Sequence, residues 1–459
     1  FNNRQLLPVA QSAFTTFLGV GNEKALVGRY GWLFYRPDIE HITGRPFLDP
    51  AHLRRRRHVA SQTVRPVEPD PRPAIVDLHR QLQARGIRLV VMPTPLKPQV
   101  HPEMFSSRFA GHADLPLRNA SFDAFVADLR AAGVDVFDPG PLLVAARSAA
   151  DGRFTFQHLA TDTHWTPQAM DRVAAALALH IAPFLPDRPP VNYVRSPMTV
   201  RSPGDTLSML RLPAGVIPDE QVEVQVVKTA QQELWRSDRT ADVLLLGDSF
   251  SNIYSLPGMG LGDSAGLAEQ ISFRLARPLD AILRNDAGGS ATREMLAREL
   301  ARGRDRLAGK KVVIWQFANR ELSFGDWPKI EMALRPAPPA RFLSLAPGQR
   351  RTLSGTIAQI TAAPRPGTVT YKDHVIAAHL VDLEEGDAPI PGGQMLVYML
   401  SMRDNEWTNA ARLRPGQRIE VRLRAWADVA AAYDGLRRND LADPDLEAEE
   451  PNWAEEVRP

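Results

Sequence analysis

The sequence predicts an α/β protein, in which a doubly wound, mostly parallel sheet is followed by a small C-terminal β-barrel or β-sandwich. Three observations support this prediction. Helix-periodic segments alternate with short apolar segments through roughly the first 330 residues, a pattern typical of helices and strands wound into one sheet. The proline-rich segment 335–340 then interrupts the pattern. Beyond it, strand-like segments follow one another with turns between them.

The elements of the first part can be assigned in order. Residues 31–35 are aromatic and flanked by turn residues, which favours a short strand or hairpin. Helix periodicity over Ala74–Arg85 ends at Gly86, a residue suited to a helix C-cap. We predict further helices at 122–132, 168–181 and 291–304, and strands at 87–93, 134–137, 242–247 and 311–317.

The second part reads as a β domain. Ile419, Val421 and Leu423 alternate with charged residues, as in a strand with one buried face. Other strand candidates lie at 352–361, 368–383 and 395–402. We therefore predict an α/β domain over residues 1–338, a β domain over 339–435 and an acidic tail over 436–459. That tail is expected to lie on the surface or to move.

Composition excludes several classes of protein. The chain has 459 residues and a net charge of +2, from 55 basic and 53 acidic residues, so no nucleic-acid partner is expected from the total charge. The basic run 52–58 favours a solvated helix face, with an acidic polymer contact as the alternative. The absence of cysteine excludes disulfides, thiolate catalysis and cysteine zinc sites.

Two further features concern location. No stretch of about 20 apolar residues occurs, so no transmembrane segment is expected. The first residue is Phe1 rather than Met, which suggests a mature, exported protein whose signal peptide has been removed.

The most informative motif is Gly247-Asp248-Ser249, which ends the apolar run beginning at Asp242. A buried parallel strand with this ending would present a serine hydroxyl at the carboxyl edge of the sheet, where such folds bind ligands. A serine needs a neighbouring base to act as a nucleophile. Asp162 and His164 offer a carboxylate and an imidazole separated by one residue, ahead of the helix that Thr166 would cap.

Each motif has a structural alternative. A second Gly-Asp-Ser, at 262–264, follows no evident strand and reads as a turn. Asp162-x-His164 could be a hydrogen-bonded helix entry, or half of a metal site with His158. We predict no metal, because no recognisable ligand spacing completes such a site.

Here the sequence resembles the alginate O-acetyltransferase family, SGNH-hydrolase-like enzymes that acetylate bacterial exopolysaccharides. The segments that carry the resemblance are 31–34 (GWLF), 93–97 (PTPLK), 162–165 (DTHW), 204–207 (GDTL), 247–250 (GDSF) and 315–322 (WQFANREL). Asp-x-His precedes the serine here, which is the order of the acetyltransferase branch. The resemblance covers roughly residues 25–330 and implies an SGNH-like fold for that part.

The resemblance also implies roles for individual residues. Ser249 would be the nucleophile, His164 the general base and acid, and Asp162 its orienting partner, while Trp165 could form a wall of the site. The oxyanion hole in such folds uses the nucleophile's own backbone N–H and donors from later loops. Gly288 and Gly289 could let backbone N–H groups approach an acyl oxyanion, or could simply form a helix-entry turn.

Weaker candidates for substrate contacts are Tyr254 and Arg293, and then Lys97. Trp407 and Trp426 could stack on sugar rings or belong to the core of the β domain. The role of that domain stays open between polymer binding, partner docking and structural support.

These observations lead to a periplasmic enzyme, without a cofactor, that moves acetyl groups onto a polysaccharide through an acetyl-serine. An acetylesterase with the same residues is the nearest alternative, and a non-catalytic polysaccharide-binding or scaffold protein of an export complex is another. The resemblance further implies a membrane-bound O-acyltransferase partner that supplies acetyl groups.

Overall fold

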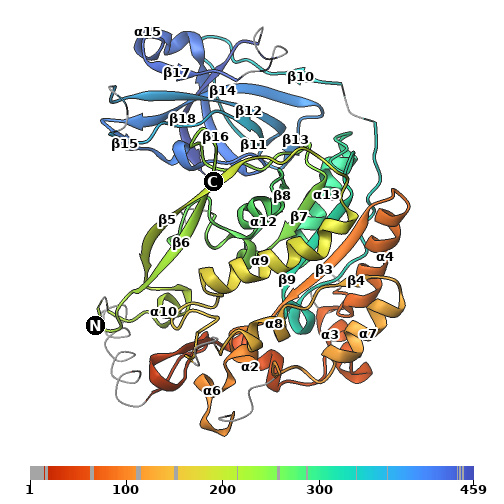
Figure 1. Ribbon diagram of the computed structural model, residues 1–459. Helices are drawn as coiled ribbons and strands as arrows, with labels where there is room; N and C mark the ends of the chain where they lie inside the picture. Colours follow the sequence, from red (N-terminus) through yellow and green to blue (C-terminus); the bar gives the residue numbers. More distant parts are fainter. Residues whose placement is uncertain are drawn as a thin grey trace. The chain divides into compact units, whose positions relative to one another are not determined.

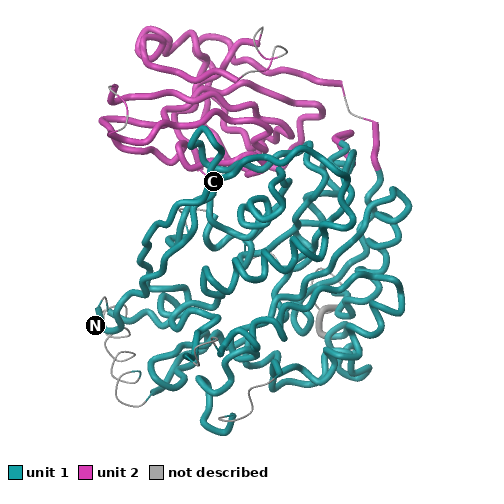
Figure 2. The backbone as a smooth tube through the Cα atoms, in the orientation of Figure 1, with its two compact units in different colours: residues 1–300, 305–333 teal, residues 301–304, 334–459 magenta. Residues whose placement is uncertain are grey.

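The computed structural model describes residues 15, 19–61, 67–109, 115–148, 153–213, 215–255, 259–285, 288–336, 339–367, 369, 371–441, 443, 446 and 449–458. The chain forms two compact units (Figure 2): one contains residues 1–300 and 305–333, the other residues 301–304 and 334–459. The expected boundary at Pro338 lies outside the described residues. Among the described residues, no helix is both long and apolar enough to cross a membrane.

The first unit is built on a five-stranded, all-parallel sheet with the order β4-β3-β9-β7-β8. Its strands are β3 (Arg88–Thr94), β4 (Asp135–Val136), β7 (Val243–Gly247), β8 (Asp280–Leu283) and β9 (Val312–Ala318). Every residue of β7 and β9 is buried, because helices cover both faces of the sheet (Figure 1).

Alternate residues of each central strand enter two different cores. Val243 and Leu245 pack in one, with α9 (Pro167–Ile181) and α12 (Leu267–Leu275). Leu244 and Leu246 pack in the other, with α4 (Pro71–Gln83), α7 (Phe122–Ala131) and α13 (Ala291–Ala301). The prediction of a doubly wound α/β domain is confirmed.

Helix α9 begins as its sequence predicts, directly after the segment that carries Asp162 and His164. The Thr166 hydroxyl oxygen accepts a hydrogen bond from the Ala169 N–H at 3.2 Å, and Pro167 occupies the first turn. A threonine cap satisfies one of the free N–H groups at the helix start, and proline there loses no hydrogen bond. The cap thereby fixes where the preceding loop ends.

Two antiparallel pairs of strands form separate small sheets. Strands β1 (Ala25–Val27) and β2 (Leu33–Tyr35) form the first, as the aromatic segment predicted. Strands β5 (Tyr193–Ser202) and β6 (Glu220–Thr229) form the second, with ten paired positions. The second pair was not predicted, although Val222, Val224 and Val226 alternate with polar residues along β6. Most positions of both strands are half-buried or exposed.

The second unit is a small β-barrel. Its strands are β11 (Arg350–Ile360), β12 (His374–Glu385), β14 (Gly393–Arg403), β16 (Arg418–Ala425) and β18 (Asn452–Arg458). They pair in the order β14-β18-β16-β11-β12, and pairing of β12 with β14 closes the ring. Closure removes the exposed edges of the sheet. The expected alternation of β16 is present, with Ile419, Val421 and Leu423 in the core.

The prediction of a surface or mobile acidic tail is wrong for residues 452–458. Residues 452–458 form β18, which pairs with β16 and β14 inside the barrel. The acidic composition of this segment was misleading, because arginines of a neighbouring strand balance its negative charge. Glu455 lies 3.4 Å from Arg422 and 3.3 Å from Arg424 on the outer face of β16, whereas Trp453 is buried.

Candidate active site

Ser249 lies two residues after the end of β7, at the start of the short helix α11 (Ser249–Asn252), which Asp248 caps. The Asp248 carboxylate fixes this turn by accepting from the Phe250 N–H at 2.9 Å and from the Ala318 N–H of β9 at 2.7 Å. Gly247 is needed because a Cβ there would lie 2.4 Å from Ser251 Oγ. The strand and turn therefore hold the Ser249 hydroxyl at the carboxyl edge of the sheet.

The structure brings Asp162, His164 and Ser249 together. His164 Nε2 lies 2.8 Å from Ser249 Oγ, and His164 Nδ1 lies 2.6 Å from Asp162 Oδ1. All three are buried. The carboxylate only accepts hydrogen bonds, so Nδ1 carries a proton, and Nε2 of the neutral ring is free to accept the serine proton. The arrangement meets the geometry for activating an alcohol.

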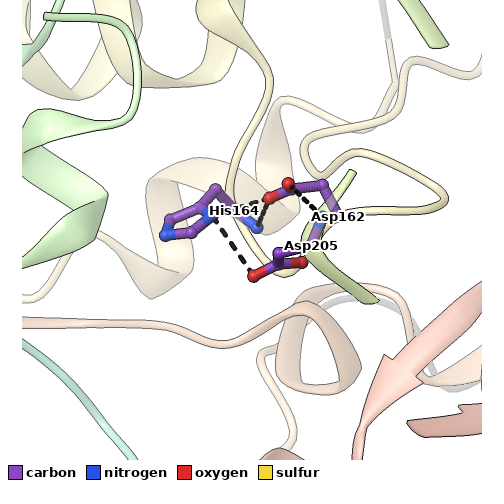
Figure 3. Close-up of side chains that lie close together, drawn as sticks. All are labelled: Asp162, His164 and Asp205. Carbon is purple, nitrogen blue, oxygen red and sulfur yellow. Dashed lines mark hydrogen bonds and ion pairs between the residues drawn. The ribbon is translucent and has the colours of Figure 1, made fainter. Parts of the chain in front are cut away.

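Asp205 is a second carboxylate beside the same imidazole (Figure 3). It begins helix α10 (Asp205–Leu210), and its N–H donates to Asp162 Oδ2 at 2.8 Å. Its carboxylate accepts from the Thr163 N–H at 2.7 Å, and Oδ2 lies 3.9 Å from His164 Nδ1. Asp205 therefore orients the Asp162 carboxylate and adds negative charge next to the imidazole.

The segment that carries Asp205 packs tightly on the catalytic loop. The preceding Gly204 has a φ of +84°, and a Cβ there would lie 2.4 Å from the carbonyl oxygen of Thr161. Only glycine fits this approach without strain. The motif at 204–207 was noted in the sequence. Its contact with residues about forty positions earlier could not be seen there.

The buried charges shift the pKa values of the site. Burial alone would raise the pKa of Asp162, but the adjacent His164 outweighs it and lowers that pKa to about 2. Burial likewise opposes the charged form of His164, yet Asp162 and Asp205 outweigh it and raise the pKa of the imidazole. The pKa of Asp205 is raised by burial and by Asp162. The site favours an ionised Asp162 and a more basic His164.

A cavity of about 520 Å³ opens onto the catalytic side chains. A volume of this size suits part of an oligosaccharide or another small ligand. Besides the residues already described, its walls include Tyr35, Ser202, Ser208, Met209, Met259, Asn285, Gly288, Arg320 and Glu321. Sequence reasoning noted Arg320 and Glu321 only as parts of a motif and gave Asn285 no role of its own.

The two glycines proposed for the oxyanion hole differ in their surroundings. Gly288 lines the cavity and has a φ of +70°. The Gly289 N–H donates to Glu321 Oε2 at 3.2 Å, and its carbonyl accepts from Trp315 Nε1 at 3.2 Å. The N–H of Gly289 thus already has a partner, which makes Gly288 the better placed of the two.

Three other candidates lie away from the cavity, which corrects their expected substrate contacts. The Tyr254 hydroxyl donates to the Trp165 carbonyl at 2.5 Å, and Trp165 Nε1 donates to the Phe250 carbonyl at 3.0 Å; both rings are fully buried. Arg293 is also buried, over the Trp315 ring at 4.4 Å, and burial lowers its pKa to about 10. Residue type alone did not show that these side chains point into the core.

Lys97 is a buried support of the catalytic loop. Its ammonium donates to the carbonyl oxygens of Leu33, at 2.6 Å, and Ala160, at 3.1 Å. Burial lowers its pKa to about 8, against the opposing effect of nearby carboxylates such as Asp205 and Asp162. Lys97 therefore ties β2 to the loop that carries Asp162.

The remaining motifs lie elsewhere. Ser264 of the second Gly-Asp-Ser has a φ of +51°, and its hydroxyl donates to the Val227 carbonyl, as in a turn. The basic run lies on helix α3 (Pro50–Ser61). In the barrel, Trp407 Nε1 donates to the Pro364 carbonyl, and Trp426 packs edge-on against Tyr398.

Within the described ranges, one group of histidine and carboxylate side chains is compact enough to hold a metal ion. Its members are Asp162, His164 and Asp205, whose ligand atoms all lie within 4.8 Å of one another. Nδ1 of His164 is already bonded to Asp162, and Asp162 Oδ2 to the Asp205 N–H. A metal would have to replace these bonds, so the expectation of a metal-independent site stays a prediction.

A parallel α/β sheet that presents a serine, a histidine and an aspartate at its carboxyl edge is the architecture of SGNH-hydrolase-like domains. Residues 25–319 match the family model described as "SGNH hydrolase-like domain, acetyltransferase AlgX". The chain belongs to this acetyltransferase family, which confirms the resemblance noted from its motifs.

Three individual relatives share between 15% and 28% sequence identity with the chain. The chain is 28% identical over 314 residues to the "Probable alginate O-acetylase AlgJ" of Pseudomonas aeruginosa, covering 67% of this chain and 72% of that protein. Among solved structures, the O-acetyltransferase domain of Pseudomonas putida AlgJ is 20% identical, with 66% of this chain and 92% of that chain covered and a TM-score of 0.46. Pseudomonas aeruginosa AlgX is 15% identical, with 86% and 90% covered and a TM-score of 0.45.

Proposed function

We propose that this protein transfers acetyl groups onto hydroxyls of a bacterial exopolysaccharide through an acetyl-Ser249 intermediate. The observation that carries the proposal is the hydrogen-bonded chain from Ser249 Oγ through His164 to Asp162, with links of 2.8 and 2.6 Å, at the wall of a cavity. Membership of the acetyltransferase family supports the same chemistry.

In the first half-reaction, Ser249 Oγ attacks the carbonyl carbon of an acetyl ester as His164 Nε2 takes the hydroxyl proton. Collapse of the tetrahedral intermediate breaks the bond from the acetyl carbon to the donor oxygen, and the imidazolium returns the proton to that oxygen. Asp162 holds the ring in place and stabilises the imidazolium. The product is an acetyl-serine and the donor alcohol.

In the second half-reaction, a sugar hydroxyl takes the place of the donor alcohol. His164 accepts its proton, the sugar oxygen attacks the acetyl carbon, and the bond to Ser249 Oγ breaks as the proton returns to the serine. Water as acceptor would instead give free acetate. The outcome depends on how well the cavity holds the sugar and excludes water.

Asn285 is our candidate for a side-chain donor to the oxyanion. Its Oδ1 accepts from Asn252 Nδ2 at 3.2 Å, which leaves Nδ2 directed toward Met259 Sδ at 3.2 Å. A thioether is a weak acceptor, so this N–H group is available to a stronger one. A single oxyanion donor is worth about 3 kcal/mol of transition-state stabilisation.

Two experiments test the proposal. A fluorophosphonate probe should label the wild type at Ser249 and should not label Ser249→Ala; a folded wild type that resists labelling would favour the non-catalytic scaffold. Incubation with an acetyl ester and an oligosaccharide should give acetylated oligosaccharide by mass spectrometry. Free acetate as the sole product would favour the acetylesterase.

We further propose that the enzyme acts in the periplasm and receives acetyl groups through a membrane-bound O-acyltransferase. The support is the family resemblance of its motifs. Co-purification of the two proteins from cells that make the polymer would test the partnership, and fractionation of the same cells would test the compartment.

A further inference from the structure

A second cavity, of about 450 Å³, lies in the first unit and is separate from the one beside Ser249. Within the described ranges, no residue lines both cavities. The second is bordered by residues 158–160 and Thr166, which flank Asp162 and His164 in the chain, and by residues 220–223 of β6. Its volume is typical of a small-ligand site, and the proposed acetyl transfer uses none of its side chains.

Two exposed phenylalanines lie next to each other at this cavity. Phe154 and Phe156 are each 46% exposed, and their ring centroids are 5.2 Å apart. Phe156 lines the cavity, and its ring lies 4.9 Å from the ring of Trp32, a buried residue that also lines it. Neighbouring exposed aromatic rings at a cavity indicate a binding surface, whereas single exposed apolar residues do not.

Hydrogen bonds of the intervening residues hold this segment in place. The Thr155 hydroxyl donates to the Ala146 carbonyl at 2.6 Å, and Gln157 Nε2 donates to the same carbonyl at 3.1 Å. The polar residues of the segment are therefore anchored to the protein, while the alternate phenylalanine rings stay exposed. A ligand would meet rings that are already positioned, which reduces the entropy cost of binding.

His158 adds a hydrogen-bond acceptor to the same cavity. It lines the cavity, and it is 1% exposed. Its Nε2 lies 3.3 Å from the Pro95 carbonyl oxygen, which only accepts, so Nε2 carries the ring proton and Nδ1 a lone pair. Nδ1 is buried and has no hydrogen-bond partner among the residues that the structure describes. A ligand hydroxyl would supply the missing donor to this desolvated nitrogen.

These two features together match a pyranose ring. Such a ring has apolar C–H groups on its faces and hydroxyls around its edge. The C–H groups can pack on the Phe156 ring, and the hydroxyls can bind His158 Nδ1 and the amides of Gln168 and Gln221, which also line the cavity. An apolar side chain of a partner protein would cover the rings but would leave Nδ1 without a donor.

We propose that the second cavity is a saccharide-binding site, in which a pyranose ring stacks on Phe156 and donates a hydroxyl hydrogen bond to His158 Nδ1. The site holds a sugar residue away from Ser249, and the proposal does not depend on the transfer of acetyl groups.

The test follows binding at Trp32, inside the proposed site. The full chain is labelled with 5-fluorotryptophan, and the fluorine signal of Trp32 is assigned by its loss in Trp32→Phe. Oligosaccharides of β-1,4-linked mannuronate and of β-1,4-linked mannose are titrated separately into the Ser249→Ala form, so that no turnover occurs. We expect a saturable shift of the Trp32 signal with at least one of them. A folded protein whose Trp32 signal moves with neither would overturn the proposal.

Two exposed phenylalanines provide a matched pair of variants, both built on Ser249→Ala. Phe156→Ala removes the ring at the cavity and should weaken binding, measured from the Trp32 shift, about tenfold. Phe324→Ala removes a ring that is 49% exposed but lines neither cavity, and should leave the affinity unchanged. Equal affinities of the two variants would show that the sugar binds elsewhere, against the proposal.

His158→Phe tests the acceptor, because it keeps an aromatic ring and removes both ring nitrogens. A folded variant should bind about tenfold more weakly, and undiminished binding would contradict the assigned hydrogen bond. Since His158 is buried, its folding is checked by thermal unfolding. Should it not fold, the comparison of Phe156→Ala with Phe324→Ala decides alone.

The proposed function is tested separately. Turnover of p-nitrophenyl acetate by the wild type, lost in Ser249→Ala, reports on the serine chemistry alone. A wild type without turnover would refute that chemistry and leave the saccharide site standing. An active wild type whose Trp32 signal does not respond in the Ser249→Ala form would do the opposite.

Discussion

Replacing Asp205 with asparagine should move the pH dependence of the enzyme in a direction set by the geometry. Asp205 Oδ2 lies 3.9 Å from His164 Nδ1 and favours the imidazolium. The Asp205→Asn variant keeps the shape and an acceptor for the Thr163 N–H but removes the charge. The folded-state pKa of His164 should therefore fall.

The size of the shift follows from Coulomb's law. Two unit charges 3.9 Å apart interact by about 1 kcal/mol in bulk water and about 4 kcal/mol at an effective dielectric constant of about 20. At 1.36 kcal/mol per pKa unit, these limits give about 0.8 to 3 units. The Asp205 side chain is 32% exposed, so solvent screening places the expected shift near the lower limit, at about 1 unit.

The assay is the pH profile of kcat/KM for an acetyl ester, whose acid limb reports the free enzyme's base. Because catalysis requires neutral His164, the acid limb should move to lower pH by about 1 unit. The exposed Asp187→Asn makes the same charge change elsewhere and should leave the limb unmoved. An acid limb that stays in place or moves to higher pH in Asp205→Asn would refute the reasoning.

Four further predictions follow from the structure. Asn285→Ala should lower kcat by about 10² to 10³ with little change in KM; an unchanged kcat would exclude Asn285 as an oxyanion donor. Gly204→Ala, whose Cβ would collide with the Thr161 carbonyl at 2.4 Å, should lower the free energy of unfolding by about 1 to 3 kcal/mol in denaturant titrations; the exposed Gly215→Ala, also at positive φ but with no contact within 4 Å, should cost less. The pKa of Asp162 is depressed to about 2 from an ordinary value of 3.8, so its ionised carboxylate stabilises the fold fully above pH ~4, and this stabilisation is lost as pH falls toward ~2. Over that range the wild type should lose about 2 kcal/mol of unfolding free energy that Asp162→Asn does not lose; parallel acid-unfolding curves would contradict this. Prolonged EDTA treatment should leave the rate of ester turnover unchanged, and loss of activity restored by a divalent cation would show that the site needs a metal.

The sequence predicted the parallel α/β unit and the barrel because their signals are local. The strand ending in Gly247, the cap at Thr166 and the alternation in β16 each lie within a few consecutive residues. The pair Asp162 and His164 was visible for the same reason, since its hydrogen bond joins residues two apart. The motifs led us to expect that this pair meets Ser249, which lies 85 positions after His164. The contact itself could be seen only in the folded structure.

The features that sequence analysis did not predict depend on contacts between distant parts of the chain, which composition does not encode. Asp205 reaches the imidazole only because β5 and β6 bring α10 back to the catalytic loop. Tyr254 and Arg293 have side chains suited to binding, yet the fold turns them into the core. Strand β18 was not predicted because its glutamates suggested an exposed tail, whereas in the structure Glu455 pairs with arginines on another strand.

The hydrogen bonds of Ala160 have a consequence for any shortened form of this enzyme. Its carbonyl oxygen accepts from the Leu33 N–H at 2.8 Å and from the Lys97 ammonium at 3.1 Å. A fragment that started at α4 would retain every reacting side chain and the whole parallel sheet. It would still lack the strand against which the loop bearing the acid–base pair is braced, so the smallest working catalytic module has to include the early hairpin.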